Sequence, residues 1–193
     1  MAAKNIFIHP TAAIDEGAEI GAETKIWHFC HLMPGSKVGE RCNIGQNVFI
    51  DNNVIIGNGV KIQNNVSVYN GVVIEEDVFL GPSMVFTNVI NPRSFIERKN
   101  EFKKTIVRKG VTIGANATIV CGIDIGAYAL IGAGAVVTKN VLPYALVTGN
   151  PARHSGWVSQ AGIKLDFDIQ GDAVCQQTGR VYKLKNGLVD QVQ

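Results

Sequence analysis

The sequence predicts an all-β fold, a parallel β-helix of about six to seven triangular coils, from a six-residue repeat and one interruption of it. A large apolar residue occupies every sixth position, fourteen times in succession from Ile8 to Phe86 and six more times from Val107 to Val137. Between these blocks the register is lost over residues 87–106. A repeat of this length predicts a solenoid, and the interruption predicts one long inserted loop.

The period itself determines the secondary structure. A period of six excludes an amphipathic α-helix, whose apolar positions return every three or four residues, and suits a short strand followed by a turn. Three such units close a triangular coil of eighteen residues, so the twenty repeats supply between six and seven coils. At a strand spacing of ~4.8 Å the prism is about 30 Å tall, with the large apolar side chains inside.

Two further positions of the repeat are restricted. The fourth residue after each apolar position is small or β-branched, as in Ala12, Cys30 and Val48. Glycine often follows the apolar residue directly, and Asn and Gly are frequent at the expected corners, as in residues 51–53 and 63–65. Such residues accept the left-handed backbone angles that tight corners need.

Composition narrows the class of protein. With 193 residues and 46% hydrophobic content the chain has one principal domain, and a net charge of +2 argues against a nucleic-acid or membrane-surface partner. No apolar stretch has the length of a membrane span or signal peptide, which favours a cytoplasmic location. The cysteines lack CxxC spacing, so we expect free thiols and no zinc site: Cys30, Cys42, Cys121 and Cys175.

The repeat ends before a chain segment of different character. Pro143 and Pro151 interrupt the pattern, so we expect the β-helix over residues 1–141 and an irregular C-terminal extension over residues 142–193. Within this extension, residues 167–189 alternate weakly between apolar and polar side chains. This alternation predicts a small hairpin.

The repeats resemble those of a known family. The segments IGQNVF, IGNGVK, IGANAT, IGAYAL and IGAGAV each carry an aliphatic residue, glycine, two variable residues and a small residue. This pattern resembles the left-handed β-helix acyltransferases of the hexapeptide-repeat type, over about residues 8–141. The left-handed coiling is implied by this resemblance alone, because crossovers are usually right-handed. The resemblance also implies acetyl-CoA as cosubstrate and a homotrimer with sites between subunits.

Other segments resemble a narrower group. FTNVINPRS, KIQNNVSVY, GPSMVFTN, GNPARHSGW and TGRVY are similar to N-acetyltransferases that act on 3-amino sugars attached to nucleotides. The similarity is greatest to enzymes that acetylate the 3-amino group of a UDP-linked 2-acetamido-3-amino-2,3-dideoxyglucuronic acid for lipopolysaccharide O-antigen. Enzymes acting on dTDP-linked 3-amino-6-deoxy sugars are the near alternative.

The inserted loop is basic. It carries five Lys and Arg residues against two Glu residues, a balance of +3 that exceeds the net charge of the whole chain. This charge fits a ligand bearing phosphate or carboxylate, although charged loops are also simply solvated. We expect Arg93, Arg98 and Lys99 to bind the pyrophosphate or a sugar carboxylate, and Gln63 and Tyr69 to line the acceptor groove.

The expected chemistry requires an uncharged amine, a nearby thioester carbonyl and an acceptor for the released proton. Residues 32–153 contain no histidine, and the four histidines elsewhere are more simply surface or interface residues. The resemblance places the asparagine of the FTN motif, Asn88, at the reacting amine. A carboxamide is no base at neutral pH, so Asn88 is expected to orient the amine or stabilise the tetrahedral intermediate. The alternative is a turn residue at the start of the loop.

Four residues are candidates for binding acetyl-CoA. Lys139 and Arg153 are expected to contact its phosphates, and backbone amides at Ala117 and Ala135 its pantetheine arm. No metal is expected. Three other classes stay open: an O-acetyltransferase, a zinc carbonic anhydrase with three clustered histidines, and a purely structural solenoid.

Overall fold

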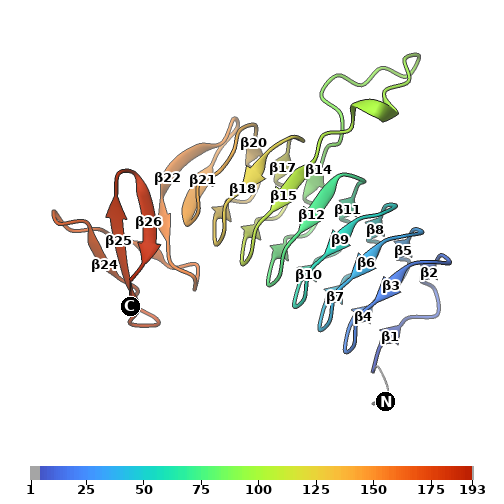
Figure 1. Ribbon diagram of the computed structural model, residues 1–193, viewed down its shortest axis with the longest axis horizontal. Coiled ribbons are helices and arrows are strands. Elements are labelled where there is room, and N and C mark those ends of the chain that lie inside the picture. Colours follow the sequence, from blue (N-terminus) through green and yellow to red (C-terminus); the bar gives the residue numbers. More distant parts are fainter. Residues whose placement is uncertain (1–4, 193) are drawn as a thin grey trace.

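The computed structural model describes residues 5–192 and shows a triangular prism of stacked coils, followed by a smaller antiparallel module at its C-terminal end (Figure 1). The predicted left-handed parallel β-helix is confirmed. The N-terminus and C-terminus lie at opposite ends of the long axis. No helix in the described part of the chain is long and apolar enough to cross a membrane.

The prism has three parallel sheets, called here faces A, B and C, in which each strand pairs with the strand three elements further along the chain. Face A contains β1 (Phe7–Ile8), β4 (Lys25–Ile26), β7 (Asn43–Ile44), β10 (Lys61–Ile62), β13 (Phe79–Leu80), β16 (Thr112–Ile113) and β19 (Leu130–Ile131). Face B contains β2 (Ala13–Ile14), β5 (His31–Leu32), β8 (Phe49–Ile50), β11 (Ser67–Val68), β14 (Val85–Phe86), β17 (Thr118–Ile119) and β20 (Val136–Val137). Face C contains β3 (Glu19–Ile20), β6 (Lys37–Val38), β9 (Ile55–Ile56), β12 (Val72–Ile74), β15 (Thr105–Val107) and β18 (Asp124–Ile125).

Every predicted repeat forms one strand. In the regular coils, residues eighteen apart are register partners, such as Lys25 and Asn43. The repeating apolar side chains fill the prism, and Ile26, Ile44 and Ile62 are fully buried. Ile8 is 41% exposed because it belongs to the first coil, which packs against a neighbouring coil on one side only.

Two separate constraints determine which residues occupy the corners of the coils. In most coils the third residue after the interior apolar residue has a positive φ, as at Asn53 (57°), Asn65 (62°) and Gly134 (68°), which confirms the expectation for corner Asn and Gly. The glycines that directly follow the apolar residue have another reason. A Cβ at Gly57 would lie 2.6 Å from the Glu76 nitrogen of the next coil, so the close approach of the two backbones excludes a side chain there.

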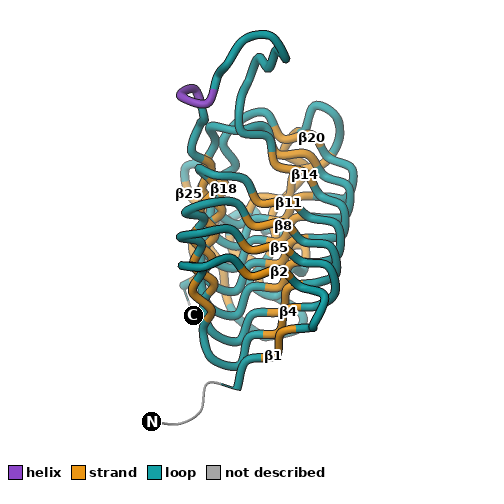
Figure 2. Tube along the Cα trace, turned by 90° about the vertical axis from the view of Figure 1, so that its right-hand side faces the viewer, coloured by secondary structure: helices purple, strands orange, loops and turns teal. Residues whose placement is uncertain are grey.

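The inserted loop leaves the prism between β14 and β15, at the edge where face B meets face C, called here the B/C edge. Figure 1 and Figure 2 show it projecting well beyond the stacked coils. It contains one 3-10 turn, η1 (Lys99–Glu101), and exposed apolar side chains of which Phe95 is 82% exposed. The loop is therefore held mainly at its base.

The C-terminal extension is more regular than expected. β21 (Ala145–Thr148) continues face A, β22 (Arg153–Val158) pairs antiparallel with β21, and β23 (Lys164–Leu165) pairs antiparallel with β22. The predicted hairpin is part of a three-stranded antiparallel sheet, β24 (Asp172–Val174), β25 (Val181–Lys185) and β26 (Leu188–Gln191). This module has a core of its own, formed by Tyr144, Leu165, Ala173, Cys175, Tyr182 and Val189.

The two corner constraints predict different costs for the same substitution. Gly57→Ala places a Cβ against the next backbone and should destabilise the protein by about 1–3 kcal/mol, as overpacking does. Gly134→Ala meets no atom within 4 Å and is strained only by its positive φ, so it should cost about 1 kcal/mol. Urea unfolding midpoints of both variants measure the difference. Equal or inverted costs would contradict the packing explanation.

Candidate active site

Asn88 lies at the base of the inserted loop, half buried, where the chain leaves face B. The preceding residue is still part of the coil, because the Thr87 amide donates to the Ile119 carbonyl at 3.1 Å. The loop closes on Asn88 itself, whose carbonyl accepts a hydrogen bond from the Lys103 amide at 2.9 Å. Both ends of the loop are thus tied together at Asn88, which fixes its backbone at the B/C edge.

Tyr69 lies at the same edge, one coil nearer the N-terminus than Thr87. Its ring centroid is 6.2 Å from that of Phe49, which in turn is 5.8 Å from the ring of His31. The His31 ring ends this column with its Nε2 3.0 Å from an Asp15 carboxylate oxygen. The structure therefore brings Tyr69 and Asn88 to adjacent coils, beside an aromatic column on face B.

Gln63 is not brought to this place. It follows β10 on face A and lies at the edge where faces A and B meet, called here the A/B edge. Within one subunit, Gln63 and Tyr69 are at opposite ends of a strand of face B.

The three predicted anion-binding residues of the loop differ in their existing partners. The Arg98 guanidinium donates to both carboxylate oxygens of Glu101, at 2.7 and 2.9 Å. Lys99 is exposed and 3.5 Å from a Glu97 oxygen. Arg93 donates to the Pro92 carbonyl at 3.1 Å and has no carboxylate within ion-pair distance in the described range 5–192. Arg93 is therefore the most available of the three for an anionic ligand.

The four histidines do not gather in one cluster, and two of them stack on each other. His9 and His28 stack with ring centroids 3.5 Å apart, and partial burial together with the charge of His28 lowers the pKa of His9. Among the residues that the structure describes, no group of three or more His, Cys, Asp or Glu side chains is arranged to hold a metal ion.

A cavity of about 450 Å³ lies between the last coil and the β21–β22 hairpin. Lys139 and Arg153, the two residues predicted to bind cofactor phosphates, both line it. His154 and Trp157 line it as well, with ring centroids 4.5 Å apart, and Val141 and Val147 add apolar surface. Trp157 was not among the predicted site residues, and His154 was expected at the surface or at an interface, because neither residue lies within the repeat.

The expectation of exposed amides at Ala117 and Ala135 is wrong. Both residues are fully buried at inner corner positions. The Ala117 amide donates to the Gly114 carbonyl at 3.3 Å, and the Ala135 amide to the Gly132 carbonyl at 3.2 Å. The tight turn uses these two donors itself, so they are not available to a pantetheine arm.

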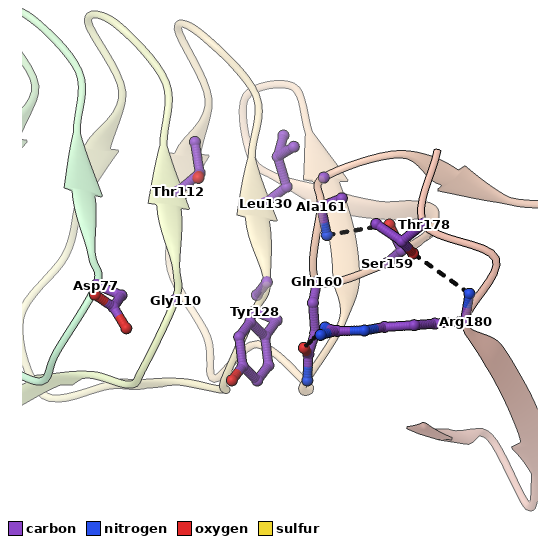
Figure 3. Close-up of a pocket in the computed structure, with 12 residues that line it drawn as sticks. Asp77, Gly110, Thr112, Tyr128, Leu130, Ser159, Gln160, Ala161, Thr178 and Arg180 are labelled. Atoms are coloured by element: carbon purple, nitrogen blue, oxygen red, sulfur yellow. Dashed lines mark hydrogen bonds between the residues drawn. The ribbon is translucent and has the colours of Figure 1, made fainter. Parts of the chain in front are cut away.

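A second cavity, of about 660 Å³, separates the C-terminal module from face A (Figure 3). Gln160 connects the two parts: its side-chain amide donates to the Tyr144 hydroxyl at 3.3 Å, and its backbone amide to the Tyr182 hydroxyl at 3.0 Å. Arg180 donates to the carboxamide oxygen of Gln160, as the figure shows. None of the predicted site residues lines this cavity, and its polar network serves to attach the module.

The comparisons with known proteins identify the repeats. The family model described as "Bacterial transferase hexapeptide (six repeats)" matches residues 17–52 and 104–139, and the "Hexapeptide repeat of succinyl-transferase" model matches residues 36–70. A dTDP-3-amino-3,6-dideoxy-alpha-D-galactopyranose 3-N-acetyltransferase from Aneurinibacillus thermoaerophilus is 47% identical over 186 residues, covering 96% of this chain and 95% of that protein.

Solved structures share the fold. A hexapeptide-repeat acetyltransferase from Vibrio cholerae, complexed with acetyl coenzyme A, has a TM-score of 0.57 and 27% identity, covering 65% of this chain and 72% of that one. A variant of an N-acyltransferase from Bacillus cereus, in complex with dTDP and coenzyme A, has a TM-score of 0.54 and 20% identity. That match covers 81% of this chain and 83% of that one, and shows the architecture alone.

The basic residues of the 450 Å³ cavity give a direct prediction. If the cavity binds the phosphates of acetyl-CoA, Lys139→Ala and Arg153→Ala should each raise the KM for acetyl-CoA roughly 10-fold, because each removes a charge-assisted contact. Lys37→Ala is the matched control. Lys37 lies on face C in the second coil, where it forms an ion pair with Glu19 of the first coil. Initial rates at varied acetyl-CoA measure the effect. Unchanged KM values in both cavity variants would exclude this assignment.

Proposed function

The chain belongs to the hexapeptide-repeat acyltransferase family, and we propose that it is an acetyl-CoA-dependent N-acetyltransferase acting on the 3-amino group of a nucleotide-linked 3-amino-deoxyhexose. One observation carries this proposal: the 47% identity to a 3-N-acetyltransferase of a dTDP-linked 3-amino sugar, which extends over 95% of that protein. The likeness includes the inserted loop and the C-terminal extension, which are not part of the repeat.

For the nucleotide we propose dTDP, carrying a 3-amino-3,6-dideoxyhexose. The sequence motifs favour a UDP-linked uronic acid instead, whereas the relative that matches nearly end to end is named for a dTDP-linked deoxy sugar. A 6-deoxy sugar has no carboxylate to neutralise. The cation of Arg93 is then needed only for the diphosphate, which all nucleotide sugars share.

The resemblance of the FTN motif and the position of Asn88 at the base of the loop support acetyl transfer at this residue. The neutral amine attacks the thioester carbonyl, a C–N bond forms, and collapse of the tetrahedral intermediate breaks the C–S bond and releases the CoA thiolate. The Asn88 carboxamide can accept a hydrogen bond from the amine or donate one to the oxyanion, and the loop closure at its carbonyl holds it in place. The proton lost by the amine goes to the thiolate or to solvent.

The proposed active enzyme is a homotrimer with its sites between subunits. Gln63 and Asn88 lie on different edges of one prism, so a site that includes both needs two subunits. A closed threefold assembly brings different edges of neighbouring prisms together. The loop projects away from its own prism (Figure 2), which supports a role at a subunit interface.

The acceptor assay tests the proposed function. Thiol release from acetyl-CoA should require a nucleotide-linked 3-amino sugar and be fastest with the dTDP-linked 3-amino-3,6-dideoxyhexose. A UDP-linked 2-acetamido-3-amino uronic acid is the second acceptor, and a dTDP-linked 3-hydroxy sugar is the control that lacks the nucleophile. Faster turnover of the uronic acid would overturn the choice of dTDP. Release with the hydroxy sugar alone would indicate an O-acetyltransferase.

Asn88→Ala should lower kcat by roughly 100-fold or more, as removal of a transition-state hydrogen bond does, without changing the thermal unfolding midpoint much. Asn52→Ala is the matched control, because Asn52 occupies the same corner position two coils below. Steady-state kinetics and thermal melts of both variants measure the difference. Normal turnover by Asn88→Ala would leave Asn88 as a turn residue only.

A further inference from the structure

A small cavity on the A/B edge, far from Asn88 within the same subunit, has the features of a ring-binding subsite. Its volume is about 220 Å³, and Trp27, His28, Asn43, Gly45, Gln63 and Asn64 line it. We call it the edge notch. Pockets for drug-sized ligands start at about 300 Å³, so the notch suits a single ring better than a whole nucleotide.

One glycine lies in the middle of the notch. Trp27, Gly45 and Gln63 occupy the same corner position in three successive coils, eighteen residues apart. The side chains of Trp27 and Gln63 project from the edge, while Gly45 between them projects nothing. A Cβ at Gly45 would lie 2.7 Å from the Asn64 side-chain oxygen, so the notch is lined by backbone at this point, with the Trp27 indole in the coil before it and the Gln63 carboxamide in the coil after it.

The indole of Trp27 is held rigidly although it is 36% exposed. Its Nε1 donates to the Asn43 carboxamide oxygen at 2.9 Å. The His28 ring lies nearly parallel to it, with an interplanar angle of 9°. An exposed aromatic ring whose orientation is already fixed is a suitable stacking platform for a planar ligand.

The opposite wall of the notch is made of carboxamides. The side-chain oxygen of Asn64 accepts a hydrogen bond from the backbone amide of Gln46 at 2.9 Å, so the side-chain NH₂ group of Asn64 is the part left for a ligand. Gln63 offers both a donor and an acceptor. The edge of a pyrimidine base presents donors and acceptors together, and single bases are bound by stacking combined with hydrogen bonds to such an edge.

We propose that the edge notch binds the pyrimidine base of the nucleotide sugar, with the base stacked on Trp27 and its edge bonded to Gln63 and Asn64. This inference rests on the proposed function. The coil of Trp27 lies three coils, about 14 Å, below that of Asn88. An extended nucleoside diphosphate spans such a length between its base and its sugar. Asn88 lies on the B/C edge of its subunit, whereas the notch lies on the A/B edge. In the proposed trimer, a nucleotide sugar whose amine lies at Asn88 of one subunit therefore places its base in the notch of the neighbouring subunit.

The chain contains two tryptophans, which allows a direct binding test. In the Trp157→Phe variant Trp27 is the sole tryptophan, and titration with dTDP alone should change its fluorescence in a saturable way. GDP at the same concentrations should give a much weaker response, because the edge of guanine presents a different arrangement of donors and acceptors to Gln63 and Asn64. This test needs neither a sugar nor turnover. No response to dTDP, or an equal response to GDP, would overturn the proposed subsite.

A kinetic test uses the native chain as reference. Trp27→Ala should raise the KM for the accepted nucleotide sugar roughly 10- to 100-fold through lost stacking, with kcat and the KM for acetyl-CoA nearly unchanged. Trp27→Phe should restore much of the affinity, which a merely structural role of Trp27 would not require. Ile55→Ala, at an exposed position on face C, is the surface control.

The outcomes separate the subsite from the proposed function. Acetylation of a 3-amino sugar with an unchanged KM in Trp27→Ala would overturn the subsite and leave the function. A dTDP response of Trp27 without acetylation of any 3-amino sugar would support the subsite and overturn the function. Circular dichroism of Trp27→Ala checks that the variant is folded, and Gln63→Ala provides a second variant for the KM measurement.

Discussion

The hydrogen bonding between coils at an eighteen-residue interval is the constraint on which the rest of the structure depends. Each strand of two or three residues is too short to be stable alone and gains its partners from the coils above and below. For the ladder to continue, the backbones at the corners must approach closely. The glycines after the apolar residues meet this requirement, since a Cβ at Gly39, Gly57 or Gly114 would lie 2.5 to 2.6 Å from an atom of the next coil.

This constraint also determines where specific binding groups can stand. The interior positions belong to apolar side chains, and many corners belong to glycine or to residues with positive φ. The residues proposed to bind ligands accordingly lie where the repeat is interrupted or where a larger side chain replaces glycine. Asn88 stands where a coil opens into the loop, Lys139 and Arg153 where the last coil gives way to β21 and β22, and Trp27 and Gln63 where glycine is replaced at an edge.

The sequence predicts the prism well, because the apolar residue at every sixth position directly indicates which side chains face the interior. The positions of Ile26, Ile44 and Ile62 in the sequence sufficed to assign strands and interior. Sites are less predictable, since they depend on which residues stack after coiling. Lys139 and Arg153, fourteen residues apart, share one cavity, whereas Gln63 and Tyr69, only six apart, lie on different edges. The amides of Ala117 and Ala135 looked available only because the sequence does not show which carbonyls a turn uses.

The coil spacing also constrains the fate of the proton in the proposed reaction. His31, paired with Asp15, is the histidine of face B, but it lies three coils below Asn88, about 14 Å along the prism axis. That distance is far beyond the reach of a general base, which needs about 3 Å or a single bridging water. His28 belongs to the same coil as His31 and His9 to the coil before it, both on the A/B edge, where they stack on each other. Within a subunit none of these three can act at Asn88, which supports the proposal that the departing thiolate or solvent accepts the proton.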